Sequence, residues 1–472
     1  LIEGRKVSYL DVFADKVAQV DNPYDMTCVA NEDDAEGMME SRRRLVAQSL
    51  GIEPSRIDFL DHAGCHAYYA YMSHPTRSKP LTILVADGYG DGVNGSIWLG
   101  MPGGLLSPVL RTGQCNIGRI YRYITLLLGM KPNEHEFKVM GLAPYSNSRY
   151  AEKAYSILAE TLQVDGIDFA YKVKPNDHFF HFRDRLGACR FDGIAHALQQ
   201  RTEELLLAWM QNAIKETGAP DLCLSGGVAL NVKANMLMAE SESVASLFVP
   251  PGSNDESLPI GAAFFALAKT MFENGQPVDA VSPFTTPYMG RSYTDKECED
   301  AISSANLSAD IRVRKAGVQD IADVLAGNSV VARFDGAMEF GPRALGNRSI
   351  LADPRQPEAI RLINLMIKKR DFWMPFCPSI LESRANDYLQ LPDKPVSTSF
   401  MSVGFRSTPL GRRHLPAALH PYDNTARPQI VNSRSNPGYH ELITAFEERT
   451  GVGCLLNTSF NLHGEPIVES PT

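Results

Sequence analysis

The run Leu81-Thr82-Ile83-Leu84-Val85-Ala86, followed directly by Asp87 and Gly88, decides the fold class. A short apolar run that ends in a glycine-rich turn, here residues 88–92, is typical of a buried strand. Similar runs lie at 222–224, 244–249, 330–332 and 454–456, and helical periodicity appears at 194–217, 258–272 and 439–449. Strands that alternate with amphipathic helices predict an α/β fold in which helices cover a sheet.

A break in this alternation lies between residues 277 and 295. It contains Pro277, Pro283 and Pro287 and few periodic apolar residues. We therefore predict two domains, residues 1–285 and 286–472. The 472 residues are enough for both, since a domain holds roughly 100–200 residues.

The composition restricts the partners and the compartment. The net charge is -9 and no long Lys/Arg tract occurs, so we expect no nucleic-acid partner. No apolar run approaches the roughly 20 residues of a membrane span, so we expect no membrane partner. The eight cysteines form no CxxC pair, which indicates reduced thiols and a cytoplasmic location. The sequence does not fix the oligomeric state, and a homodimer is one expectation.

A metal-binding pattern lies just before the first strand. A helix with Asp61 as its N-cap would carry His62 and His66 on one face, one turn apart, so that both imidazoles reach one ion. Asp87 and Asp255 each follow a predicted strand, where α/β sheets place their ligand sites, and they are candidate carboxylate ligands. Each residue also has an ordinary interpretation, since Asp87 favours a tight turn and Asp255 suits a helix N-terminus.

A second pattern is a strand, a Gly226-Gly227 turn and a helix. Glycines there let a nucleotide approach the backbone N–H groups at a helix N-terminus. Asn231 and Asn235, one turn apart on the helix, are candidates to reach a ribose or a base. A close-packed turn without a ligand is an equally good interpretation.

The third pattern is cationic and lies in the second predicted domain. Arg343 and Arg348 stand five residues apart in a segment shaped by Gly341-Pro342 and Gly346, and guanidinium groups match phosphate bidentately. The cationic run at 368–370 is as readily a set of solvated charges. Further candidate ligands of the same pocket are Lys368, Arg370, Arg427 and Asn457.

In this order, these segments resemble the NodU/CmcH family of O-carbamoyltransferases. The resemblance covers most of the chain from about Asp61 onward. The motifs that carry it are the His62/His66 helix, Asp87-Gly88, Glu136 to Tyr145, Ser225 to Asn231, Glu339 to Ile350 and Asn457 to Asn461.

The resemblance implies a first domain of the actin-like ATPase (ASKHA) superfamily, similar to threonylcarbamoyl-transferase subunits, and a second, YrdC-like domain. The second domain would form carbamoyl-adenylate from ATP and carbamoyl phosphate. The first would pass the carbamoyl group to a hydroxyl of a small natural product, such as an antibiotic precursor. One divalent metal is implied, with Fe²⁺ preferred and Zn²⁺, Mn²⁺ or Co²⁺ left open.

The resemblance also implies roles for individual residues. The metal ligands would be His62, His66, Asp87 and Asp255, and the catalytic residues His62, His66, Arg343 and Arg348. The ligands of ATP or carbamoyl phosphate would be Gly226, Gly227, Asn231, Lys368, Arg370, Arg427 and Asn457.

The family pattern is not recognisable in residues 1–34. We therefore expect the first domain to be incomplete at its N-terminal part, and its catalytic base stays unassigned. Two other functions remain open. One is a tRNA-modifying threonylcarbamoyl transferase, which the acidic balance and the second domain disfavour. The other is a nucleotide-binding scaffold without catalysis.

Overall fold

The structure, a computed structural model, describes residues 35–284, 286–368, 371–462 and 464–472. The chain divides into two compact units, Leu1–Leu60 and Asp61–Thr472. In the first unit, helix α2 (Ala35–Leu50) is followed by the 3₁₀ turn η2 (Pro54–Arg56), and Arg43 donates to the carbonyl of Ile57. The expectation of an incomplete first domain falls on residues 1–34, which lie outside the described residues.

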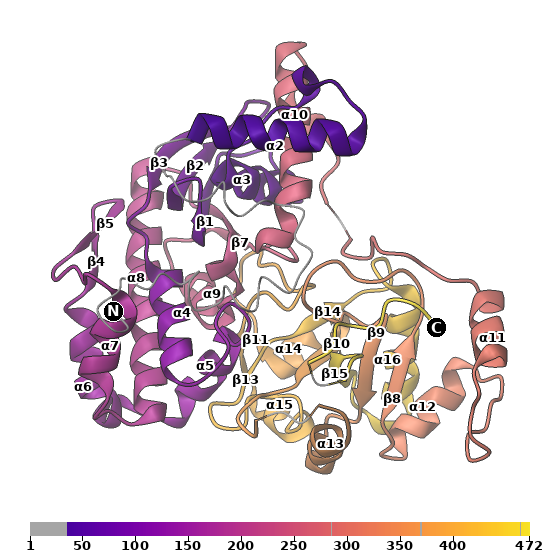
Figure 1. The fold of residues 1–472 in the computed structure, drawn as a ribbon. Coiled ribbons are helices and arrows are strands. Elements are labelled where there is room, and N and C mark those ends of the chain that lie inside the picture. Colours follow the sequence, from indigo (N-terminus) through magenta and orange to yellow (C-terminus); the bar gives the residue numbers. More distant parts are fainter. Residues whose placement is uncertain (1–34, 285, 369–370, 463) are drawn as a thin grey trace. The chain divides into compact units, whose positions relative to one another are not determined.

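The second unit begins with a five-stranded sheet in the order β3-β2-β1-β6-β7 (Figure 1). Its strands are β1 (Leu81–Gly90), β2 (Val93–Gly100), β3 (Ser107–Thr112), β6 (Asp221–Ser225) and β7 (Ser246–Phe248). β1 pairs antiparallel with β2 and parallel with β6. The predicted end of β1 at Ala86 is wrong. The strand runs on through Asp87, with a register shift between Ala86 and Gly90, and turns at Asp91 and Gly92, whose φ angles are 50° and 79°.

Helices cover both faces of this sheet. Ile83 and Val85 of β1 pack in one apolar cluster with side chains of α3 (His62–Ser73) and α10 (Leu258–Glu273). Leu84 and Ala86 point the other way, into the cluster that contains side chains of α4 (Ile117–Leu127) and α8 (Phe191–Thr217). Because successive side chains of a strand alternate between faces, β1 is buried on both sides.

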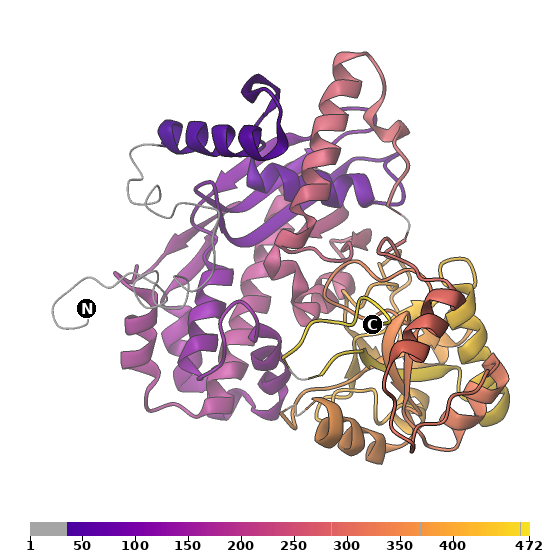
Figure 2. The same cartoon turned by 45° about the vertical axis from the view of Figure 1, so that its right-hand side comes forward.

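The second half of the unit, coloured orange to yellow in Figure 2, is built on another sheet. The order of its strands is β14-β10-β15-β9-β8. Its strands are β8 (Val331–Phe334), β9 (Arg348–Ala352), β10 (Cys377–Leu381), β14 (Gln429–Val431) and β15 (Cys454–Ser459). Only β10 and β14 pair in parallel, and the other neighbours are antiparallel. Helix α16 (Pro437–Thr450) packs on β10 and β15, and α12 (Val318–Ala326) packs on α16.

Smaller elements complete the described fold. The remaining α-helices are α5 (Glu136–Leu142), α6 (Ser148–Ala159), α7 (His178–Leu186), α9 (Val232–Glu240), α11 (Asp295–Ser304), α13 (Pro357–Ile363), α14 (Ala385–Tyr388) and α15 (Pro409–His414). The other strands are β4 (Leu162–Asp165), β5 (Asp168–Tyr171), β11 (Leu389–Gln390), β12 (Phe405–Ser407) and β13 (Thr425–Ala426). None of the described helices combines the length and the apolar character that a membrane crossing requires.

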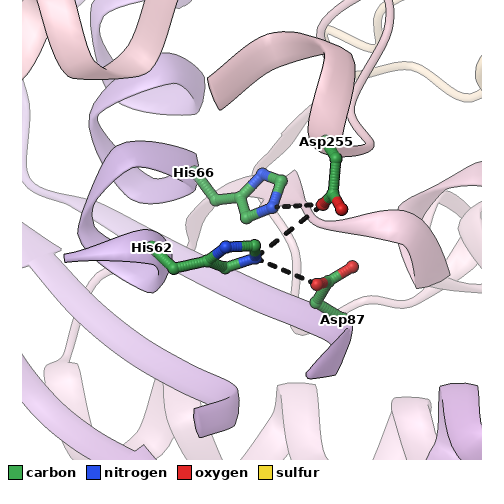
Figure 3. Close-up of side chains that lie close together, drawn as sticks. All are labelled: His62, His66, Asp87 and Asp255. Atoms are coloured by element: carbon green, nitrogen blue, oxygen red, sulfur yellow. Dashed lines mark hydrogen bonds and ion pairs between the residues drawn. The ribbon is translucent and has the colours of Figure 1, made fainter. Parts of the chain in front are cut away.

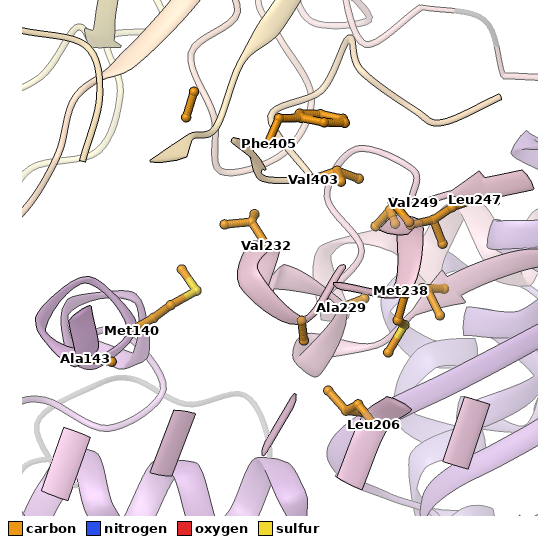
Figure 4. Packing of buried hydrophobic residues seen from close by; sticks show 14 of the residues in the cluster. Met140, Ala143, Leu206, Ala229, Val232, Met238, Leu247, Val249, Val403 and Phe405 are labelled. Carbon is orange, nitrogen blue, oxygen red and sulfur yellow. The ribbon is translucent and has the colours of Figure 1, made fainter. Parts of the chain in front are cut away.

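Side chains of both sheets belong to one apolar core. Figure 4 shows the part of this core where α9 meets the segment that leads into β12. Val232, on α9, faces Val403 and Phe405 of the second half. The N–H of Gly404 donates to the carbonyl of Val232 at 3.0 Å, and a Cβ at Gly404 would lie only 3.0 Å from that oxygen. The prediction of an α/β fold is confirmed. The predicted domain boundary at residue 285, which itself lies outside the described residues, stays a prediction.

Candidate functional site

The start of α3 places two imidazoles beside each other. Asp61 caps the helix, since its Oδ2 accepts the N–H of Gly64 at 2.7 Å. His62 opens the helix, and its own N–H donates to Asp91 Oδ2 at 2.9 Å. His66 follows one turn later with no exposed surface. The two rings lie 4.9 Å apart between centroids at an angle of 70°.

Asp87 and Asp255 complete a four-residue cluster with these histidines (Figure 3). His62 Nε2 lies 3.1 Å from Asp87 Oδ2 and 3.8 Å from Asp255 Oδ1, and His66 Nε2 lies 3.4 Å from the same Asp255 oxygen. One donor atom from each residue falls within 4.8 Å of the others. The structure therefore brings together the four residues that the sequence separates by almost 200 positions.

Hydrogen bonds hold Asp87 ionised. Burial alone would raise its pKa, but the hydrogen bond with His62, the nearby His66 and the N–H groups of Gly227 and Gly88 lower the pKa to about 2. The Gly227 N–H donates to Asp87 Oδ1 at 2.8 Å. The same hydrogen bond with Asp87 raises the pKa of His62 against the effect of burial. The cluster is thus electron-rich and suited to a cation.

His66 shows most directly that a cation fits. Its Nδ1 lies 3.4 Å from Ser225 Oγ and 3.5 Å from Ser257 Oγ. Its Nε2 is buried and has no hydrogen-bond partner among the described residues, although it points at Asp255. A buried polar atom without a partner is uncommon in proteins and calls for a ligand. Imidazole and carboxylate donors are those that divalent transition metals prefer.

A cavity of about 1060 Å³ extends from this cluster into the second half of the unit. Asp87 and Asp255 lie on its wall, and so do Arg343 and Arg427. Gly227 and Asn231 also line it. The cavity therefore connects the candidate metal ligands with two of the predicted phosphate ligands.

Arg348, which the sequence places in a phosphate-binding role, is not in the cavity wall. It has no exposed surface, and its guanidinium donates to the carbonyls of Asp335, Gly336 and Asn347 at 3.0–3.2 Å. It also lies 3.7 Å from the ring centroid of Phe334. Carbonyls of its own segment and of Arg291 therefore hold the guanidinium of Arg348 inside the protein and away from the cavity. Its catalytic role stays a prediction that this position does not support.

The segment that carries Arg343 is held from both sides. Glu339 Oε1 accepts the backbone N–H groups of Leu345 and Asn347, both at 2.7 Å, and of Arg348 at 3.1 Å. Asn457 Nδ2 donates to the carbonyl of Ala344 at 3.1 Å. Asn457 is buried and is not in the cavity wall, so in this structure it supports the segment around Arg343, and its role as a nucleotide ligand stays a prediction.

Lys368 is buried beside the end of β15. Its Nζ donates to the carbonyl and hydroxyl oxygens of Ser459 and to two oxygens of Asn461, over 2.5–3.1 Å. Ser459 and Asn461 line the cavity, whereas Lys368 is not in its wall. Lys368 therefore does not line the cavity itself but holds two residues that do. Arg370 lies outside the described residues.

The Gly226-Gly227 turn does not offer free N–H groups to a nucleotide. The N–H of Gly226 donates to Ser253 at 2.9 Å, and that of Gly227 goes to Asp87. At Gly226, where φ is 86°, a Cβ would lie 2.3 Å from the carbonyl oxygen of Ala86. The N–H groups of both glycines are therefore engaged within the protein, and Gly226 packs closely against β1, while Gly227 lines the cavity. The adenylate contact of these two glycines stays a prediction.

Two asparagines follow this turn. Asn231 lines the cavity while its side chain caps α9. Asn235 is buried and donates to the carbonyls of Ala229 and Ser402, so it does not reach a ligand.

Some residues of the cavity wall were not predicted as site residues. Ser459 and Asn461 belong to the motif Asn457 to Asn461, in which only Asn457 is a predicted ligand. No sequence signal marked Cys377, Lys233 or His420. They line the cavity because segments from both halves of the unit contribute to its wall.

Two family models and several known proteins match this chain in sequence. One family model, described as the carbamoyltransferase N-terminus, matches residues 30–264, and another, described as the carbamoyltransferase C-terminus, matches residues 322–472. The chain is 32% identical to the nodulation protein NolO of Bradyrhizobium diazoefficiens, over 87% of this chain and 74% of NolO. It is 33% identical to the nodulation protein NolNO of Sinorhizobium fredii, over 91% of this chain and 63% of that protein.

A crystal structure of full-length HypF in its phosphate- and nucleotide-bound form aligns with a TM-score of 0.29 and 13% identity over 51% of each chain, too low to bear on the fold. The two family models, matched in chain order, and the relationship to NolO show that the chain belongs to the carbamoyltransferase family.

Proposed function

We propose that the chain is an O-carbamoyltransferase that forms carbamoyl-adenylate from ATP and carbamoyl phosphate and transfers the carbamoyl group to a hydroxyl of a small natural product. The observation that carries this proposal is the single cavity that joins the His62/His66/Asp87/Asp255 cluster to Arg343 and Arg427. An activated carbamoyl group made at one end can reach the acceptor at the other without leaving the protein. We also propose the division into domains at residue 285.

The four residues of the cluster would hold one divalent metal ion, and the buried Nε2 of His66, which has no hydrogen-bond partner in the described part of the chain and faces Asp255, supports this assignment. Fe²⁺ is our first choice, with Zn²⁺, Mn²⁺ and Co²⁺ as alternatives. Such an ion polarises the acceptor oxygen or the carbamoyl carbonyl when it is bound. The chain itself orients the ligands, since Gly227 holds Asp87 and two serines flank Nδ1 of His66.

At the other end of the cavity, Arg343 and Arg427 would bind phosphate groups. Formation of carbamoyl-adenylate releases inorganic phosphate from carbamoyl phosphate and pyrophosphate from ATP, and both leaving groups carry negative charge that a guanidinium neutralises. Because Glu339 and Asn457 fix the segment around Arg343, its position does not depend on the substrate. This part of the site would serve adenylate formation.

The test is incubation of the full chain with ATP, carbamoyl phosphate and a panel of hydroxylated small molecules, analysed by mass spectrometry. We expect one added carbamoyl unit on an acceptor, together with AMP and only when ATP is present. Carbamoylation of tRNA alone would support the tRNA-modifying alternative. ATP binding without cleavage under any acceptor condition would support the scaffold and contradict the proposal.

A further inference from the structure

Cys377, the first residue of β10, and Arg427, two residues before β14, both line the cavity. β10 and β14 pair in parallel with Ser379 opposite Gln429, and Ser379 Oγ lies 2.9 Å from Gln429 Oε1. Cys377 and Arg427 each stand two residues before this pair, so the sheet brings them close together. Arg427 Nε lies 3.2 Å and Nη2 3.0 Å from Cys377 Sγ.

The sulfur occupies one edge of the guanidinium only. An arginine has five N–H donors in a planar fork. With Nε and one side of Nη2 turned to Cys377, the N–H groups of Nη1 and the outer side of Nη2 form the second edge of the fork. This edge has the geometry that binds a phosphate through two parallel hydrogen bonds.

A thiol is a weak and formally uncharged acceptor. It can therefore orient Arg427 without cancelling its charge. Lys233, another cation of the cavity wall, shows the contrast, because its Nζ is paired with the carboxylate of Asp423. Within the described part of the chain, no carboxylate forms an ion pair with Arg427.

We propose that Cys377 is a positioning residue that holds the Arg427 guanidinium toward a phosphate group of the substrate and leaves its charge available. This inference rests on the proposed function, since it takes the anion to be a phosphate of ATP or carbamoyl phosphate. Cys377 is 5% exposed and starts β10, so its sulfur is fixed by the sheet rather than by the substrate.

The test is calorimetric titration of the full chain with two probes, ATP and inorganic phosphate. The variants are Cys377→Ala, Cys377→Ser and Cys377→Asp. The matched control is Cys454→Ala, a buried cysteine of β15 opposite Ile380 of β10 that does not contact a guanidinium. Thermal unfolding of each variant shows that it is folded.

We expect Cys377→Ala to weaken binding of at least one probe about five- to tenfold, because the guanidinium loses its orientation. Cys377→Ser keeps an acceptor and should stay within about twofold of the native chain. Cys377→Asp should bind that probe more weakly than Cys377→Ala, because its carboxylate pairs with Arg427 and neutralises it. Simple loss of packing predicts no such order.

Native affinity of Cys377→Ala for both probes would overturn the proposal, and so would Cys377→Asp binding at least as well as Cys377→Ala. A native chain that binds neither probe would also overturn it. These outcomes are separable from failure of the proposed function. If the native chain binds the probes and the variants follow the expected order, but no acceptor is carbamoylated, only the proposed function fails.

Discussion

Replacement of Gly90 by alanine should disturb the candidate metal site through one methyl group. A Cβ at Gly90 would lie 2.3 Å from Cγ of His62 and 2.5 Å from both Cδ2 and Nδ1. Carbon atoms in contact prefer separations of roughly 3.5–4.0 Å, so the imidazole must move by about 1 Å or more. A shift of this size changes the position of Nε2, which now lies 3.1 Å from Asp87 Oδ2.

The size of the effect follows from this displacement. Metal–ligand distances are held to within about 0.2 Å, and disturbed support of a metal-ligating histidine typically lowers affinity about 10- to 100-fold. Overpacking of this kind costs about 1–3 kcal/mol of stability, which a folded unit of this size tolerates. We therefore expect Gly90→Ala to fold, to bind metal at least tenfold more weakly and to lose transfer activity.

The matched control is Gly88→Ala. Gly88 lies on the same strand, but a Cβ there would meet no heavy atom within 4 Å. Metal content would be measured by elemental analysis and affinity by titration of the metal-free protein, with transfer followed by mass spectrometry. If Gly90→Ala retains the metal affinity and activity of Gly88→Ala, His62 is not a ligand in the arrangement described here.

Four further predictions concern other parts of the chain. His62→Ala should abolish transfer while ATP- and carbamoyl-phosphate-dependent adenylate formation persists, and equal loss of both in a folded variant would refute the division of labour. Arg348→Met should lower the free energy of unfolding by about 3–5 kcal/mol in urea titrations, because several buried carbonyls lose charged donors. Arg343→Ala should raise the KM for carbamoyl phosphate, because Arg343 lines the cavity. Burial and the nearby Arg119 lower the pKa of His178 to about 4, so the unfolded chain binds more protons than the folded chain between about pH 4 and 6.5. The free energy of unfolding should therefore rise with pH across that window by about 2 kcal/mol, since partial exposure weakens the effect. His178→Gln should flatten this rise in unfolding measured from pH 4 to 7.

The metal cluster could be predicted from the sequence because its geometry is mostly local. Two histidines four residues apart share a helix face whatever the rest of the fold does. Asp255 follows β7, and Asp87 lies within β1, just past the last residue that pairs in parallel with β6. Because β1 and β7 lie two positions apart in one sheet, the two carboxylates come to the same edge of that sheet, although β1 extends past its predicted end.

The phosphate side could be predicted only in part, because long-range contacts decide which donors stay available. Arg343 and Arg348 look alike in sequence. Arg348, however, opens β9 opposite Phe334, and this pairing turns its side chain onto the sheet. In the sequence, the Gly227 N–H is a possible donor to a nucleotide. In the structure it donates to Asp87, a residue of β1 that is 140 positions away. No sequence pattern predicts a role for Cys377, because its partner Arg427 is 50 residues away in the chain.

The position of β15 has a consequence for how the protein is made. This strand follows β8, β9, β10 and β14 in the chain but lies between β10 and β9 in the sheet. While the ribosome is still adding residues 454–459, those two strands have unpaired edges, and Lys368 lacks the oxygens that later surround it. Such edges invite pairing with other chains. We therefore expect nascent chains arrested before Cys454 to require a chaperone and to aggregate without one.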